Sequence, residues 1–145
     1  MGKRTRRGTE LPETVFCDAS YLIAFFAPSD SAHEKARRIR KRFKDRPVRL
    51  FTLWPLLSEA ATILLYHYGY AHASALLQAV RAFTVLTPDE NDYVEASALF
   101  KEWNRDQKLS LNDLLTYVIV KGRLKDMPVL SFDRDIVRMR LRIVT

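Results

Sequence analysis

Four carboxylates lie in stretches of the sequence whose other residues are mainly apolar. They are Asp18, Glu59, Asp113 and Asp133. A buried carboxylate without a partner is costly, so each side chain needs a cation, a proton or a hydrogen bond. If the four converge, they repel one another, and a hard divalent cation such as Mg²⁺ removes the repulsion. Bound Mg²⁺ or Mn²⁺ would polarise a phosphoryl oxygen and lower the pKa of a bound water, which is the chemistry of phosphodiester cleavage.

Two of these acids follow short apolar runs that are typical of buried strands. Asp18 comes directly after Thr14–Cys17, and Asp133 comes two residues after Pro128–Ser131. In open parallel α/β sheets, ligands bind at the carboxyl ends of the strands, above all where the strand order reverses. We therefore expect Asp18 and Asp133 to be candidates to meet at one edge of the sheet.

The other two acids lie on helices that are otherwise apolar. Glu59 has Leu56 and Ile63 as helical neighbours at i−3 and i+4, and Asp113 lies near the start of an apolar helix. All four acids together make a stronger case for one acidic pocket than any of them alone.

Each acid also has a simpler explanation. Asp18 and Asp133 could cap the helices that follow them, and Ser110 and Asp113 have the spacing of a capping box. Glu59 could reach solvent or pair with an arginine. These explanations stay open at the level of the sequence.

Short apolar strands alternate with helices along the whole chain. The predicted strands are Thr14–Cys17, Arg49–Thr52, Phe83–Leu86, Pro128–Ser131 and Leu141–Val144. The predicted helices cover residues 20–27, 31–44, 54–68, 71–81, 88–105, 110–122 and 133–139. This alternation indicates an α/β fold with a mostly parallel sheet that is covered on both sides.

The composition sets further bounds. The chain has 145 residues, which fits one domain over residues 14–145 preceded by a basic flexible arm over residues 1–13. Four scattered glycines exclude a glycine-rich phosphate loop, and one cysteine excludes an internal disulfide or a cysteine-based zinc site. No apolar run is long enough to span a bilayer and no secretory signal is evident, so we expect a cytoplasmic protein without a membrane partner.

The net charge of +7 indicates a polyanionic partner, most simply nucleic acid. Residues 34–49 hold nine basic residues against two acidic ones, and residues 121–145 hold seven against three. The candidates for guiding a nucleic acid are Arg37, Arg38, Arg40, Lys41 and Arg42. The guanidinium group suits phosphate oxygens, although a solvated helix face would explain the same charges.

Five short motifs follow one another at a characteristic spacing. They are Val15-Phe16-Cys17-Asp18-Ala19-Ser20, Ser31-Ala32-His33-Glu34-Lys35-Ala36, Glu59 on its apolar helix, Leu109-Ser110-Leu111-Asn112-Asp113 and Val129-Leu130-Ser131-Phe132-Asp133-Arg134-Asp135. No single motif is specific, but the ordered set resembles the PIN-domain ribonucleases, in particular the VapC-like toxins of toxin–antitoxin pairs. The resemblance covers residues from about Thr14 to Val144.

The resemblance implies a fold, a metal site and a reaction. The fold is a five-stranded parallel sheet of order 3-2-1-4-5, flanked by helices, in which strands 1 and 4 are neighbours. The implied catalytic and metal-binding residues are Asp18, Glu59, Asp113 and Asp133, supported by Ser20, Asn112, Ser131 and Asp135, with Asp135 also a candidate fifth acid. The metal is Mg²⁺ or Mn²⁺, and water attacks the phosphorus in line to leave a 5′-phosphate and a 3′-hydroxyl. Asn112, which precedes Asp113, would give a second metal fewer charged ligands, and Ile136 stands where an aromatic is common.

The sequence thus predicts a metal-dependent endoribonuclease that acts as the toxin of a toxin–antitoxin pair. Its partners would be an RNA substrate, a cognate antitoxin and a second copy of the chain. An apolar stripe could form a homodimer or antitoxin surface, or could be ordinary core: Leu64, Leu65, Tyr68, Leu76 and Leu77.

Two alternatives stay open, a non-catalytic nucleic-acid-binding or interaction protein on the same fold and an RNA-processing PIN nuclease. A phosphatase is disfavoured because Ser20 stands where such enzymes need a second acid. A receiver domain is disfavoured because no adjacent acidic pair follows the first strand.

Overall fold

A computed structural model describes residues 12–144 of the chain. Residues 1–11 of the predicted basic arm, and residue 145, lie outside the described residues. The elements are β1 (Thr14–Cys17), α1 (Ala19–Phe26), α2 (His33–Arg42), β2 (Arg49–Leu53), α3 (Trp54–His67), α4 (Tyr70–Gln78), the 3₁₀ helix η1 (Ala79–Ala82), β3 (Phe83–Leu86), α5 (Glu90–Trp103), α6 (Leu111–Lys121), β4 (Val129–Leu130) and α7 (Arg134–Arg138).

The described strands form one parallel sheet of order β3-β2-β1-β4. In the register of the central strand, Phe16 lies opposite Phe51 of β2 and Val129 of β4. The predicted parallel α/β architecture is therefore confirmed, and the order of the first four strands agrees with the prediction. Since β1 and β4 are neighbours, their carboxyl ends lie side by side at one edge of the sheet.

The predicted fifth strand, residues 141–144, is wrong. Within residues 12–144, Ile143 forms only an isolated parallel bridge with Val129, next to two backbone hydrogen bonds of 2.7 and 2.9 Å. β4 is only two residues long, so it offers this segment a short edge for pairing. Arg140 has a φ of +59°, a left-handed conformation that turns the chain just before the bridge.

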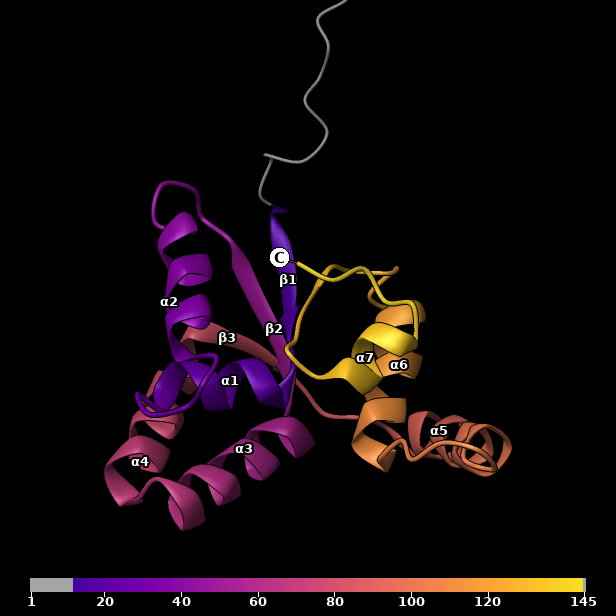
Figure 1. Cartoon of the computed structure of the whole chain (residues 1–145). Coiled ribbons are helices and arrows are strands. Elements are labelled where there is room, and N and C mark those ends of the chain that lie inside the picture. Colours follow the sequence, from indigo (N-terminus) through magenta and orange to yellow (C-terminus); the bar gives the residue numbers. More distant parts are fainter. Residues whose placement is uncertain (1–11, 145) are drawn as a thin grey trace, which may run out of the picture.

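Helices cover both faces of the sheet, as expected for parallel strands. Figure 1 shows α1, α2 and α4 on one side of β1 and β2, and α5, α6 and α7 on the other. α3 packs on α1 and α4, and α5 packs on α6. No helix within residues 12–144 is long and apolar enough to cross a membrane.

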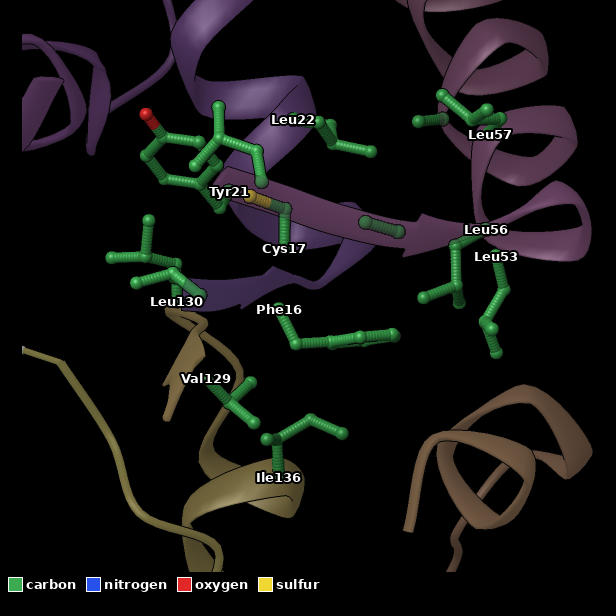
Figure 2. Packing of buried hydrophobic residues seen from close by; sticks show 14 of the residues in the cluster. Phe16, Cys17, Tyr21, Leu22, Leu53, Leu56, Leu57, Val129, Leu130 and Ile136 are labelled. Carbon is green, nitrogen blue, oxygen red and sulfur yellow. The ribbon is translucent and has the colours of Figure 1, made fainter. Parts of the chain in front are cut away.

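The central strand is buried on both faces because its alternate side chains enter different halves of the core. Phe16 points toward Val129 and Ile136, whereas Cys17 points toward the side of α1 that carries Tyr21 (Figure 2). These side chains are all almost completely buried. The period-2 alternation of a strand produces this arrangement, which fixes the end of β1, and hence Asp18, against the rest of the fold.

α2 carries much of the basic charge on an amphipathic helix. Its buried side chains are Ala36 and Ile39, followed by Phe43 just after the helix. The predicted helix start at Ser31 is two residues early, because the Asp30 side chain accepts a hydrogen bond from the Ala32 N–H and no side chain caps α2 itself. The basic residues consequently line the exposed face of α2.

Candidate metal centre

The carboxyl ends of β1 and β4 lie side by side, where the sequence predicted the candidate site. The backbone N–H of Asp18 donates to the Leu130 carbonyl oxygen at 3.0 Å, which ties the two strand ends together. The Asp18 side chain is only 3% exposed and accepts hydrogen bonds from the hydroxyls of Ser20 and Ser131, each at 2.8 Å. Asp18 is therefore a buried carboxylate held by two serines.

The two serines also fix the segment between β4 and α7. The Ser20 Oγ accepts from the Phe132 N–H at 2.9 Å, and the Ser131 Oγ accepts from the Asp133 N–H at 3.1 Å. A hydroxyl has one proton, so each serine donates to Asp18 and accepts from this segment. Both serine hydroxyls bind Oδ2 of Asp18, as does the Ser20 N–H, so Oδ1 lies outside this network.

Three further aspartates bring their side-chain oxygens together at the same edge of the sheet. One carboxylate oxygen from each of Asp113, Asp133 and Asp135 lies within 4.8 Å of the other two. Asp113 comes from the first turn of α6, Asp133 is the N-cap of α7, and Asp135 is in its first turn. The fold thus unites acids from the starts of two different helices.

Helix capping and metal binding are compatible at this site. Ser110 and Asp113 form the capping box that the sequence allows, in which the Asp113 Oδ2 accepts from the Ser110 N–H at 3.1 Å. The Asp133 Oδ1 accepts from the Asp135 N–H at 2.8 Å, so Asp133 caps α7. Each of these caps uses one carboxylate oxygen, which leaves the second for a cation.

The pKa values of Asp18 and Asp113 are raised both by burial and by repulsion from neighbouring carboxylates. Burial raises the pKa of Asp18 above its ordinary value, the two serine hydroxyls oppose this effect, and the charge of Asp133 adds to it. Burial raises the pKa of Asp113 to about 6, against the hydrogen bonds of Ser110 and with the charges of Asp133 and Asp18. A divalent cation would offset both the cost of burying these negative charges and their mutual repulsion. An all-oxygen set of ligands suits Mg²⁺ or Mn²⁺.

Glu59 lies nearby but outside the group of three aspartates. Its Oε2 accepts a hydrogen bond from the Asn112 amide at 3.3 Å. Burial raises the pKa of Glu59, the Asn112 amide lowers it, and the charges of Asp18 and Asp133 raise it further. Asn112 therefore holds Glu59 beside the other acids.

Asp135 has a closer place in the site than its supporting role in the sequence analysis suggested. The sequence Asp133-Arg134-Asp135 already pairs the two acids that lie together in the site. At a helix start, the N-cap and the residue two positions later both lie at the same end of the helix. Capping explains such a pair equally well, so only the fold reveals that Asp113 meets both carboxylates.

The parallel sheet and the carboxylates at its strand ends define an α/β domain with a candidate site for a divalent cation. A model of the PIN domain matches residues 15–141, and the chain belongs to the PIN domain family. Among solved structures, the chain is similar to the toxin VapC20 of Mycobacterium tuberculosis, described as cleaving the sarcin–ricin loop. The TM-score is 0.73 and the identity 22%, over 86% of this chain and 93% of that chain. No curated protein sequence matches the chain.

The raised pKa of Asp113 predicts a pH-dependent instability of the metal-free protein. Its carboxyl binds a proton more tightly in the folded protein, with a pKa of about 6 against an ordinary value of 3.8, so stability falls as the pH rises through this window. Asp113→Asn keeps an oxygen for the capping box and removes the charge. We expect it to stabilise the protein by about 1 kcal/mol at pH 8, after allowance for solvent screening of the charge, and by less at pH 4.5, where the folded carboxyl is still protonated.

Urea unfolding in EDTA at the two pH values measures this difference. Asp126→Asn is the matched control, because Asp126 precedes β4 at the opposite edge of the sheet and has a φ of +59°, which asparagine tolerates. Its ion pair with Lys121 is solvent-exposed and contributes little to stability. An Asp113→Asn protein that gains no stability between pH 4.5 and pH 8 relative to wild type would contradict the prediction.

Proposed function

We propose that this chain is a divalent-metal-dependent endoribonuclease and the toxin of a toxin–antitoxin pair. The observation that carries the proposal is the convergence of Asp113, Asp133 and Asp135 beside the buried Asp18, at the strand ends of a PIN domain. The proposed catalytic and metal-binding residues are Asp18, Glu59, Asp113 and Asp133, with Asp135 added as a ligand. Ser20, Ser131 and Asn112 hold these acids in position.

The side chains of the site fit cleavage of a phosphodiester bond. A divalent cation, Mg²⁺ or Mn²⁺, would supply stabilisation of charge at the phosphorus and activation of water. Ser20 and Ser131 fix Oδ2 of Asp18 by two hydrogen bonds, so Oδ1 has a defined place. In-line attack by water then leaves a 5′-phosphate and a 3′-hydroxyl. Without a cation, the cluster of carboxylates would repel the RNA phosphate, which makes the reaction dependent on the metal.

The proposal includes an RNA substrate, a cognate antitoxin and a cytoplasmic location. The similarity in fold to VapC20, a toxin described as cleaving the sarcin–ricin loop, supports this view. The exposed basic residues of α2 support it as well, because they offer a surface of positive charge to RNA.

We also propose that the chain forms a homodimer through α3 and α4. Of the predicted apolar stripe, Leu64 and Leu76 are fully buried, so that part is core. Leu65 is 47% exposed and Leu77 is 52% exposed, and with Tyr70 they line a cavity of about 450 Å³ between these helices. Exposed apolar side chains that gather in this way are typical of protein interfaces.

The purified protein is expected to cleave a single-stranded RNA in Mn²⁺ or Mg²⁺ and to lose this activity in EDTA. Readdition of the metal restores cleavage if the acids hold it. The products are separated on a gel, and labelling of their ends checks for the 5′-phosphate. A protein that binds RNA but never cleaves it in any of these conditions is the non-catalytic alternative.

A further inference from the structure

A second hollow adjoins the candidate metal centre. It is a cavity of about 570 Å³ between the start of α2, the segment from β4 to α7, and the chain near Ile143. Ser131 and Phe132 line it, and these residues also belong to the hydrogen-bond network of Asp18. We call this hollow the α2–α7 groove. The groove and the metal centre therefore adjoin at residues 131–132.

The groove is lined by cations that have no anionic partner among the described residues. Lys35, Arg38 and Arg134 line it, against the single acid Glu34. None of the three forms an ion pair with another residue of the range 12–144. All three are exposed. Unpaired cations at the rim of a hollow attract a polyanion and are available to bind phosphate oxygens.

The groove also has an aromatic and apolar wall. The Lys35 ammonium lies 5.6 Å from the centroid of the Phe132 ring, within range of a cation–π contact. Val137 is 51% exposed and lines the groove together with Ile143. An aromatic face among cations is the combination by which proteins bind single-stranded nucleic acid, since bases stack on the ring while cations bind the backbone.

We propose that the α2–α7 groove binds single-stranded RNA next to the bond that is cleaved. Arg38 and Arg134 bind backbone phosphates, and a base stacks on the Phe132 ring in place of the Lys35 ammonium. This inference rests on the proposed ribonuclease function and adds the path of the substrate. Of the five basic residues predicted from the sequence to guide RNA, only Arg38 lines the groove. Lys35 and Arg134 are added by the fold, because spacing along α2 alone does not show which side faces α7.

Binding of a fluorescent single-stranded oligoribonucleotide is measured by anisotropy in Ca²⁺, so that a cation neutralises the neighbouring acids, and a gel checks that the strand stays intact. The double variant Arg38→Ala/Arg134→Ala is expected to bind about ten-fold more weakly at 0.1 M salt. It should also lower the slope of log K against log salt by about 1.4, since two phosphate contacts are lost on a single strand. Phe132→Leu is expected to weaken binding by a further factor of about ten through lost stacking.

Two control pairs remove the same charge elsewhere. Arg81→Ala/Lys101→Ala changes exposed residues of η1 and α5, and it is expected to leave binding within about two-fold. Arg37→Ala/Lys41→Ala changes residues of α2 that do not line the groove, and it is expected to lose less than the groove pair. The proposal that the α2–α7 groove binds RNA is wrong if either control pair weakens binding as much as Arg38→Ala/Arg134→Ala. It is also wrong if the wild type shows no binding.

Cleavage by the wild type separates this inference from the proposed function. If the wild type cleaves RNA while the groove variants bind RNA as tightly as the wild type, only the proposed role of the groove is overturned. If the wild type binds RNA through the groove but never cleaves it, only the proposed ribonuclease function is overturned.

Discussion

Asp18→Asn is expected to lower RNA cleavage at least 100-fold while leaving the fold intact. Residues that merely support a metal ligand typically contribute about 10–100-fold, so loss of a ligand should exceed that range. The Asn oxygen can take the position of Oδ2 and keep the bonds from Ser20 and Ser131. The substitution removes only the negative charge of a buried carboxylate, and burial raises the pKa of that carboxyl already. Stability is therefore expected to be maintained, and activity lost.

Initial rates of cleavage under saturating Mn²⁺ measure the effect, and thermal unfolding confirms the fold. Asp126→Asn, at the opposite edge of the sheet, is the matched control and should keep wild-type activity. If the wild type stops growth when it is expressed in a bacterial host, Asp18→Asn should restore growth. Cleavage that survives in both Asp18→Asn and Glu59→Gln would show that the site has been assigned to the wrong residues.

The neighbouring positions of the strand ends that precede Asp18 and Asp133 could be predicted from the sequence, because two simple rules combine there. Apolar runs mark the strands, and the order expected for the family places strands 1 and 4 side by side. Both residues lie at strand ends, where parallel sheets bind ligands. The hydrogen bond from the Asp18 N–H to Leu130 confirms the contact of the strand ends.

Other parts of the site could not be predicted, because they depend on lengths and directions that a short pattern does not fix. An apolar run at residues 141–144 predicts burial, but two residues of β4 and a left-handed Arg140 leave only one bridge. The approach of Asp113 to Asp135 depends on where α6 begins relative to α7. The side of α2 that faces α7 depends on packing of Ile39 and Phe43 in the core.

The two explanations that the sequence left open for the acids prove to be compatible. Asp18, Asp133 and Asp113 do cap helices, as their spacing allows. Capping uses one carboxylate oxygen and fixes the direction of the other. A cap is therefore a way to preorganise a ligand, and the capping bonds contribute to the precision of the site.

Asp135→Asn is expected to weaken the binding of Mn²⁺ by more than about 100-fold, and Glu59→Gln by only about 10-fold, since residues at the margin of a metal site typically contribute about 10–100-fold. The reason is geometric, because the Asp135 carboxylate lies within 4.8 Å of those of Asp113 and Asp133, whereas Glu59 lies outside this group and binds the Asn112 amide. Titration calorimetry of the two variants with Mn²⁺ measures the difference without any substrate. Both side chains are partly exposed, so neither change should unfold the domain. The opposite ranking, with Glu59→Gln the weaker binder, would place the cation closer to Glu59 and leave Asp135 only as an acidic residue in the first turn of α7.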